Sequence, residues 1–147
     1  MNDSSKHIYE INLQWNAERK GTLSSPVLPI QIEVATPPDF PKGMKDIWTP
    51  EHLFIASVNS CYMATFLVVA ENSQFEFISF DCNSVGIVET INETLAVTQI
   101  TLKPKVVIKS AEHEEQLMKI LEKSNKECLI SNSVTTKISL EPIITVQ

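Results

Sequence analysis

The alternation of apolar and polar residues predicts strands at the start of the chain. In Ile8–Trp15 every second residue from Tyr9 onward is apolar, whereas most of the others are polar, and this is the pattern of a half-buried strand. Thr22–Leu28 and Ile30–Ala35 are two further strand candidates. The segment NAERKG between the first two predicted strands reads as a turn that Gly21 closes.

The pattern becomes helical in the segment TPEHLFIASVNSCYMATFLVVAEN. Thr49 is a suitable N-cap, Pro50 favours the first helical position, and Glu51 complements the positive end of the helix dipole. From Leu53 to Ala70 the residues are apolar on nearly every side, which predicts a helix that is buried on every side. Because one sheet of so short a chain covers only one side of this helix, we expect a second copy of the protein to cover the other.

The second half of the chain shows a different order of elements. Phe75–Val88 and Leu95–Ile108 both alternate and predict a long hairpin. Ala111–Asn125 has one apolar stripe and predicts an amphipathic helix, and Val134–Ile144 predicts a last strand. The order βββ-α-ββ-α-β predicts an α+β fold with one domain over residues 1–147, in which a strongly bent antiparallel sheet surrounds one long central helix.

Charge and hydropathy exclude several classes of partner. The net charge of −6 disfavours nucleic acid and anionic membranes. The longest apolar run, Cys61 to Ala70, is too short for the roughly 20 residues that a membrane span needs. The first ten residues, MNDSSKHIYE, contain no apolar signal core. We therefore expect a cytoplasmic protein, whose thiols are kept reduced.

Three cysteines are candidates for chemistry. The spacings of Cys61, Cys82 and Cys128 match no zinc motif and no Cys-x-x-Cys pair, and the histidines form no metal set, so no metal is expected. A free cysteine is most often a small core residue, and we interpret Cys82 as structural. A reactive Cys61 would need a cation from elsewhere in the fold, because it lies far from the N-terminus of its helix. Cys128 is either another buried cysteine or a resolving thiol.

Two charged residues are candidates for activating a thiol. Arg19 is the single arginine of the chain, which favours a role for the planar guanidinium, although a solvated turn residue is an equally good interpretation. Compensation of the helix dipole explains Glu51 fully, but this carboxylate would also form a bidentate pair with Arg19.

Three segments taken together point to a known family. WNAERKG, WTPEHLFIASVNSCYMATFL and KECLISNSV occur in this order, and they closely resemble the OsmC/Ohr family, the osmotically induced and organic-hydroperoxide-resistance proteins of bacteria. The similarity extends from Trp15 to Pro142. Many Ohr proteins have Gly-Gly-Arg where this chain has Ala-Glu-Arg-Lys-Gly, a departure that leaves both the Ohr and the OsmC branch open.

The resemblance implies a tightly intertwined homodimer and a thiol-dependent peroxidase without a cofactor. It implies that Cys61 is the peroxidatic cysteine, that Cys128 is the resolving cysteine, and that Arg19 and Glu51 form the activating pair. The implied substrates are organic hydroperoxides and, more weakly, hydrogen peroxide. An external dithiol, in some relatives a lipoylated protein, would reduce the disulfide between the two cysteines.

Two other classes of function stay open at this stage. One is an apolar-ligand-binding dimer with inert cysteines, and the other is a structural or partner-binding relative that has no activity. For the peroxidase, we expect an apolar wall around Cys61 that would suit an alkyl or lipid peroxide, formed by Phe54, Val58, Tyr62 and Phe66.

Overall fold

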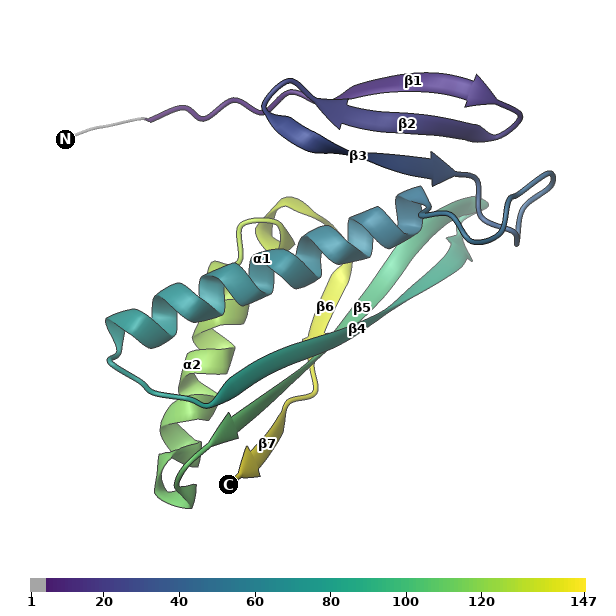
Figure 1. Cartoon of the computed structure of the whole chain (residues 1–147). Coiled ribbons are helices and arrows are strands. Elements are labelled where there is room, and N and C mark those ends of the chain that lie inside the picture. The colour runs from purple at the N-terminus through teal and green to yellow at the C-terminus, as the bar shows by residue number, and fades with distance from the viewer. Residues whose placement is uncertain (1–4) are drawn as a thin grey trace. The chain divides into compact units, whose positions relative to one another are not determined.

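The structure is a computed structural model that describes residues 5–147. The chain divides into two compact units, Met1–Leu53 and Phe54–Gln147, and Figure 1 traces both along the chain. The single domain predicted over residues 1–147 stays a prediction. The segment MNDSSKHIYE, from which we expected no export signal, lies in part outside the described residues.

The first unit contains a three-stranded antiparallel sheet in the order β1-β2-β3, formed by Asn12–Ala17, Lys20–Ser25 and Leu28–Ala35. The three strands were predicted, but β1 begins later than expected. The prediction that this strand is half-buried is wrong, because all six of its residues are exposed. The alternation of apolar residues remains, and Leu13, which is 65% exposed, pairs across the sheet with the partly buried Leu23.

The long helix α1, Pro50–Asn72, begins at the predicted cap. The Thr49 hydroxyl oxygen accepts a hydrogen bond from the backbone N–H of His52 at 3.1 Å, and the Thr49 N–H donates to His52 Nδ1 at 3.3 Å. This reciprocal arrangement resembles a capping box in which a histidine replaces the usual Glu or Gln. At the other end Gln74 has a φ of 53°, and the N–H of Phe75 donates to the Ala70 carbonyl at 2.9 Å. This Schellman motif ends the helix.

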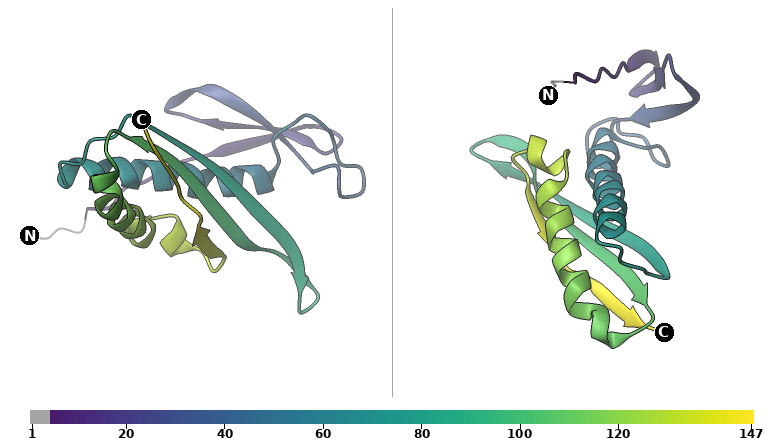
Figure 2. Two further views of the ribbon diagram at one scale, coloured as in Figure 1. Left: turned by 90° about the horizontal axis from the view of Figure 1, so that it is seen from below. Right: turned by 90° about the vertical axis from the view of Figure 1, so that its left-hand side faces the viewer.

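The second unit is organised around the predicted hairpin of β4, Ser79–Ile91, and β5, Thr94–Ile108. Figure 2 shows its length from two further sides. Asn92 and Glu93 form the connecting turn, and both have a positive φ, 49° and 65°. Two positive φ values match a two-residue turn whose twist suits the flanking strands.

The last predicted strand is interrupted in the structure. Instead of one strand over Val134–Ile144, β6 spans Lys137–Leu140 and β7 spans Ile143–Val146, and both pair with β5 in parallel. Glu141 and Pro142 separate the two strands, because proline cannot donate a ladder hydrogen bond. The prediction of an α+β fold is confirmed, but the sheet of the second unit is mixed and not wholly antiparallel.

Helix α2, Glu114–Glu127, follows a 3₁₀ turn η1, Ala111–His113. Its buried residues include the three of the predicted apolar stripe, Leu117, Ile120 and Leu121. The stripe packs with the buried side of α1 and with alternate residues of β5 in one core. The core residues of these elements are Val58, Tyr62, Phe66, Val69, Ala70, Ile100, Leu102, Val106, Ile108, Leu117, Ile120 and Leu121.

The other side of α1 is not covered by the described residues. Met63, Leu67 and Val68 are 44%, 43% and 55% exposed. Among residues 5–147, α1 is the one helix that is long and apolar enough to cross a bilayer, a test that the core helix of a soluble protein also passes. In the single chain α1 is therefore buried on one side only. Burial of the other side, which the sequence predicted, would need a second protein chain.

The burial of two leucines of the second unit predicts that truncating them to alanine has very different effects on the free energy of unfolding. Leu117 is fully buried in α2, whereas Leu129 is 67% exposed. We expect Leu117→Ala to lower the free energy of unfolding by about 2–5 kcal/mol through lost burial and a residual cavity. The matched Leu129→Ala should change it by less than about 0.5 kcal/mol. Urea denaturation at one fixed protein concentration measures both, and equal losses would contradict the packing described here.

Candidate active site

Cys61 lies in the middle of α1 and is half-buried. The backbone N–H of Ile130, which follows α2, donates a hydrogen bond to the Cys61 sulfur at 3.5 Å. Ile130 therefore brings a backbone donor to the sulfur from a part of the chain that is remote in sequence. A donor aimed at sulfur stabilises the thiolate more than the thiol.

The pKa of Cys61 lies below its ordinary value. Burial is the largest single influence and raises this pKa, but four hydrogen-bonding groups oppose it. They are the N–H of Ile130, the thiol of Cys128, the hydroxyl of Thr65 and the N–H of Leu129. The lowered pKa gives Cys61 a larger thiolate fraction than an ordinary cysteine has, and the thiolate is the form that attacks electrophiles.

Cys128 is fully buried at the C-terminal end of α2, and the two cysteines are close enough for each to shift the pKa of the other. The roles that the resemblance implies for these two cysteines stay a prediction. Burial raises the pKa of Cys128, and the neighbouring Cys61 raises it further, whereas Ser131 lowers it. The two shifts have opposite directions, so the pKa of Cys61 is the lower of the pair.

Cys82 lies on β4 and differs from both other cysteines. Burial raises the pKa of its thiol to about 11, with only the Lys103 backbone N–H opposing the shift. Its side chain packs against the core of the second unit. A thiol with so high a pKa is protonated at neutral pH, in agreement with the interpretation of Cys82 as structural.

The predicted apolar wall around Cys61 is wrong in most of its members. Val58, Tyr62 and Phe66 are fully buried core residues, and Phe54 packs against the same core. The Tyr62 hydroxyl donates to the Leu121 carbonyl at 3.0 Å, and burial raises its pKa. The Tyr62 hydrogen bond joins α1 to α2, and Phe66 stacks on Phe80 of β4, so these two side chains pack inside the core.

Arg19 lies in the first unit, in the turn between β1 and β2. Glu18, which precedes it, has a φ of 52°, and the Glu18 carbonyl accepts a hydrogen bond from Trp15 Nε1 at 3.0 Å. The Arg19 carbonyl accepts from the N–H of Thr36 at 3.1 Å. These contacts fix the backbone of the turn and leave the Arg19 side chain exposed.

Glu51 belongs to the same unit, in the first turn of α1. Its Oε1 atom is buried and has no hydrogen-bond partner among residues 5–147. No ion pair joins it to Arg19 within this part of the chain, so the activating pair stays a prediction. A buried carboxylate oxygen without a donor is unfavourable and indicates that a partner is missing.

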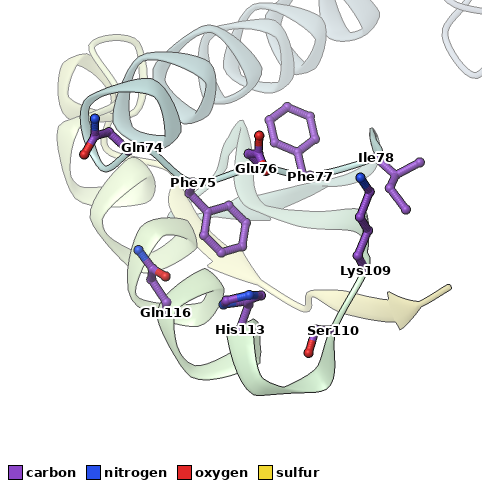
Figure 3. Close-up of a pocket in the computed structure, with 9 residues that line it drawn as sticks. All are labelled: Gln74, Phe75, Glu76, Phe77, Ile78, Lys109, Ser110, His113 and Gln116. Carbon is purple, nitrogen blue, oxygen red and sulfur yellow. The ribbon is translucent and has the colours of Figure 1, made fainter.

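A separate hollow of about 460 Å³ lies between the end of α1 and the start of α2 (Figure 3). Phe75 projects between Gln116 and His113 in this view, and its ring meets the His113 ring edge-on at 6.4 Å between centroids. None of the residues that line the hollow is a cysteine. Among the described residues, no group of three or more His, Cys, Asp or Glu is arranged to hold a metal ion.

Sequence reasoning missed the donors that lie around the two sulfurs. The N–H groups of Leu129 and Ile130 carry no sequence signal, because every residue except proline has one. Thr65 and Ser131 had a weak signal, since each is a hydroxyl residue close in sequence to a cysteine.

Comparisons with known proteins agree with the fold. The family model described as OsmC-like protein matches residues 43–142. The uncharacterized protein YmaD of Bacillus subtilis is 23% identical over 140 residues, which cover 92% of this chain and 91% of that protein.

Two solved structures have the same fold. An OsmC-like protein of unknown function from Vibrio cholerae superposes with a TM-score of 0.84 at 24% identity, covering 94% of this chain and 100% of that one. An organic hydroperoxide resistance protein from Elizabethkingia anophelis superposes with a TM-score of 0.74 at 20% identity, covering 97% and 100%.

The pKa directions predict an order of reactivity among the cysteines. Iodoacetamide reacts with the thiolate, so each alkylation rate should rise with pH through the pKa of that thiol and then level off. Because its pKa is lowered, Cys61 should level off at a lower pH than an ordinary cysteine, whereas Cys82 should still rise near pH 11. Peptide-resolved mass spectrometry from pH 5 to about 11 gives each profile within one protein. A Cys61 midpoint at or above that of Cys82 would contradict the site.

Proposed function

The chain belongs to the OsmC-like protein family, and from this membership we propose that it is a thiol-dependent peroxidase that reduces organic hydroperoxides and, more weakly, hydrogen peroxide. The family and the likeness in fold to proteins named for organic hydroperoxide resistance support a role in peroxide metabolism. The observation that carries the proposal is the thiol pair, in which a Cys61 of lowered pKa lies beside a buried Cys128 of raised pKa.

The proposed reaction has three balanced steps. The Cys61 thiolate attacks the distal oxygen of ROOH, the O–O bond breaks, and protonation of the leaving alkoxide gives ROH and a Cys61 sulfenic acid. The Cys128 sulfur then attacks the sulfenic sulfur, forming a disulfide and releasing water. An external dithiol, such as a lipoylated protein, reduces this disulfide to two thiols and is itself oxidised to a disulfide.

Arg19 and Glu51 have distinct roles in the proposal. The Arg19 guanidinium would hold the Cys61 thiolate and the negative charge that develops on the peroxide oxygen. Glu51 would accept a bidentate pair from Arg19 and orient it. The exposed guanidinium and the unpaired buried Oε1 of Glu51 support this pairing, since each lacks a partner among residues 5–147.

A homodimer is part of the proposal. Glu51 precedes Cys61 by ten positions, and at 1.5 Å per residue a straight helix separates them by about 15 Å. A guanidinium cannot bridge that distance, so we propose that each site takes Cys61 and Cys128 from one chain and Glu51, with Arg19, from the other. The exposed apolar side of α1 and the exposed β1 support a second copy as the cover. The reducing environment that this chemistry needs fits a cytoplasmic location.

The first prediction of this proposal concerns turnover. Cys61→Ser should lower the rate of cumene hydroperoxide reduction with dithiothreitol by at least about 100-fold, because a serine hydroxyl is a far weaker nucleophile at neutral pH. The matched Cys82→Ser should keep most of the activity. After one equivalent of peroxide, peptide mapping should find a Cys61–Cys128 bridge. A wild-type protein without turnover would favour an apolar-ligand-binding or non-catalytic dimer, and a bridge through Cys82 would overturn the assignment of the cysteines.

The second prediction concerns sites shared between two chains. Cys61→Ser and Glu51→Ala proteins should each be inactive, and mixing them with subunit exchange should restore about one quarter of wild-type activity. Half of the dimers are then mixed at random exchange, and each mixed dimer has one intact site out of two. The rate is measured before and after exchange.

The control for this experiment pairs two lesions that would lie in the same chain of each site. Exchange between Cys61→Ser and Cys128→Ser proteins should restore no activity, because neither mixed site contains both cysteines. Recovery in this control, or no recovery in the first mixture despite verified exchange, would show that the site is not shared in the proposed way.

A further inference from the structure

The turn that follows Cys128 carries the Ile130 N–H, which donates to the Cys61 sulfur. The turn continues into the 3₁₀ helix η2, Ser131–Ser133, and the N–H of Asn132 donates to the Cys128 carbonyl at 3.0 Å. The Ile130 nitrogen lies 3.5 Å from Cys61 Sγ. A hydrogen bond weakens steeply as the donor turns away from its acceptor. This contact therefore depends on the orientation of the peptide group that contains the Ile130 N–H.

A side chain of the same turn holds the other end of that peptide group. The peptide group joins Leu129 to Ile130, and its carbonyl, that of Leu129, accepts a hydrogen bond from the Ser133 hydroxyl at 2.9 Å. In a planar trans peptide the C=O and the N–H point in opposite directions. A bond that fixes the Leu129 carbonyl therefore also fixes the direction of the Ile130 N–H. Hydrogen bonds at both ends of one peptide group also polarise it and strengthen each other.

The hydrogen bond of Ser133 differs from an ordinary contact of a serine in a turn. Serine hydroxyls often donate to a carbonyl four residues earlier, and such a bond alone indicates only a stabilised turn. Here the N–H of the same peptide group ends on a cysteine sulfur. The neighbouring Asn132 acts elsewhere, because its side-chain amide donates to the Lys126 carbonyl at the end of α2 at 3.0 Å. Among the groups that lower the pKa of Cys61, the Ile130 N–H has the largest effect.

We propose that Ser133 is a positioning residue, whose hydroxyl holds the Leu129–Ile130 peptide group so that the Ile130 N–H stays aimed at the Cys61 sulfur and stabilises the thiolate. The consequence for peroxide reduction rests on the proposed function, but the contacts themselves do not. Ser133 acts through the peptide group, so its truncation removes no atom that bonds to the sulfur. Its side chain is exposed, so truncation also leaves no cavity in the core.

The first test measures the Cys61 thiol in the reduced full-length protein without any peroxide. Peptide-resolved alkylation by iodoacetamide gives a pH midpoint for each cysteine. Ser133→Ala should raise the Cys61 midpoint but not that of Cys82, because the donor to the Cys61 thiolate is no longer held in place. Ser133→Thr keeps the hydroxyl and should restore the midpoint. The matched Ser73→Ala, at an exposed serine after α1, should not move it. An unmoved Cys61 midpoint in Ser133→Ala would overturn the inference.

The second test removes the donor itself. Incorporation of the α-hydroxy acid analogue of isoleucine in place of Ile130 replaces the N–H by an ester oxygen and keeps the side chain. This change should raise the Cys61 midpoint by about one unit or more, which is the size expected for a hydrogen bond to a charged group. Adding Ser133→Ala to the ester protein should raise the midpoint no further, because both changes act on one contact. A further rise as large as in the amide protein would contradict the proposal.

The third test follows the first step of the proposed reaction, in which Cys61 is oxidised. In a single turnover at neutral pH, Ser133→Ala should consume cumene hydroperoxide more slowly than the wild-type protein, in proportion to its smaller thiolate fraction. Above both midpoints the two rates should converge, because both proteins are then fully ionised at Cys61. A deficit that persists there would indicate a disturbed site and would count against the inference.

These tests separate the role of Ser133 from the peroxidase itself. If the wild-type protein does not react with peroxide but Ser133→Ala still raises the Cys61 midpoint, the proposed function fails and the positioning role stands. If the wild-type protein turns over and Ser133→Ala leaves both the midpoint and the rate unchanged, the function stands and the positioning role is wrong.

Discussion

The packing of α1 against α2 and β5 is the constraint on which the cysteine pair depends. Tyr62 and Phe66 are fully buried, and the Tyr62 hydroxyl is anchored to the Leu121 carbonyl of α2. Cys61 is the residue next to Tyr62, so the packing of Tyr62 in the core also positions Cys61. The turn that leaves α2 then brings Cys128 and the N–H of Ile130 to the Cys61 sulfur.

Three chemically identical thiols acquire different acidities from their surroundings. Burial acts on all three in the same direction, because it penalises the charged form. For Cys61 the hydrogen bonds that converge on the sulfur overcome this penalty, whereas for Cys82 one backbone N–H does not. For Cys128 the neighbouring Cys61 adds to the penalty and Ser131 opposes it. The pair is therefore asymmetric before any substrate arrives, and the proposed roles of nucleophile and resolving thiol require such asymmetry.

The exposed apolar surface connects the fold to the proposed dimer. A sheet needs one face covered to be stable, yet all six residues of β1 are exposed, and Trp15 within it is 71% exposed. The exposed side of α1 has the same character. A second copy would cover both surfaces. It would also bring new hydrogen-bond donors near the buried Oε1 of Glu51. One physical requirement, the burial of apolar area, would then also complete the chemical site.

Sequence alone determined the features that depend on local chemistry. The Thr49 cap, the hairpin of β4 and β5, the apolar stripe of α2 and the family motifs were all predictable, because each depends on residues that are neighbours along the chain. It also identified Cys61 and Cys128 as a candidate pair, through resemblance and not through geometry.

Tertiary structure decided everything that depends on long-range packing. It assigned Val58, Tyr62 and Phe66 to the core instead of a substrate wall, and it divided the last strand at Pro142 into two parallel pairings with β5. The backbone donors at the Cys61 sulfur come from a turn that is remote in sequence, and their identity carries no sequence signal. A residue type determines which chemistry is possible at a position, but the acidity of a thiol depends on which dipoles the fold places around it.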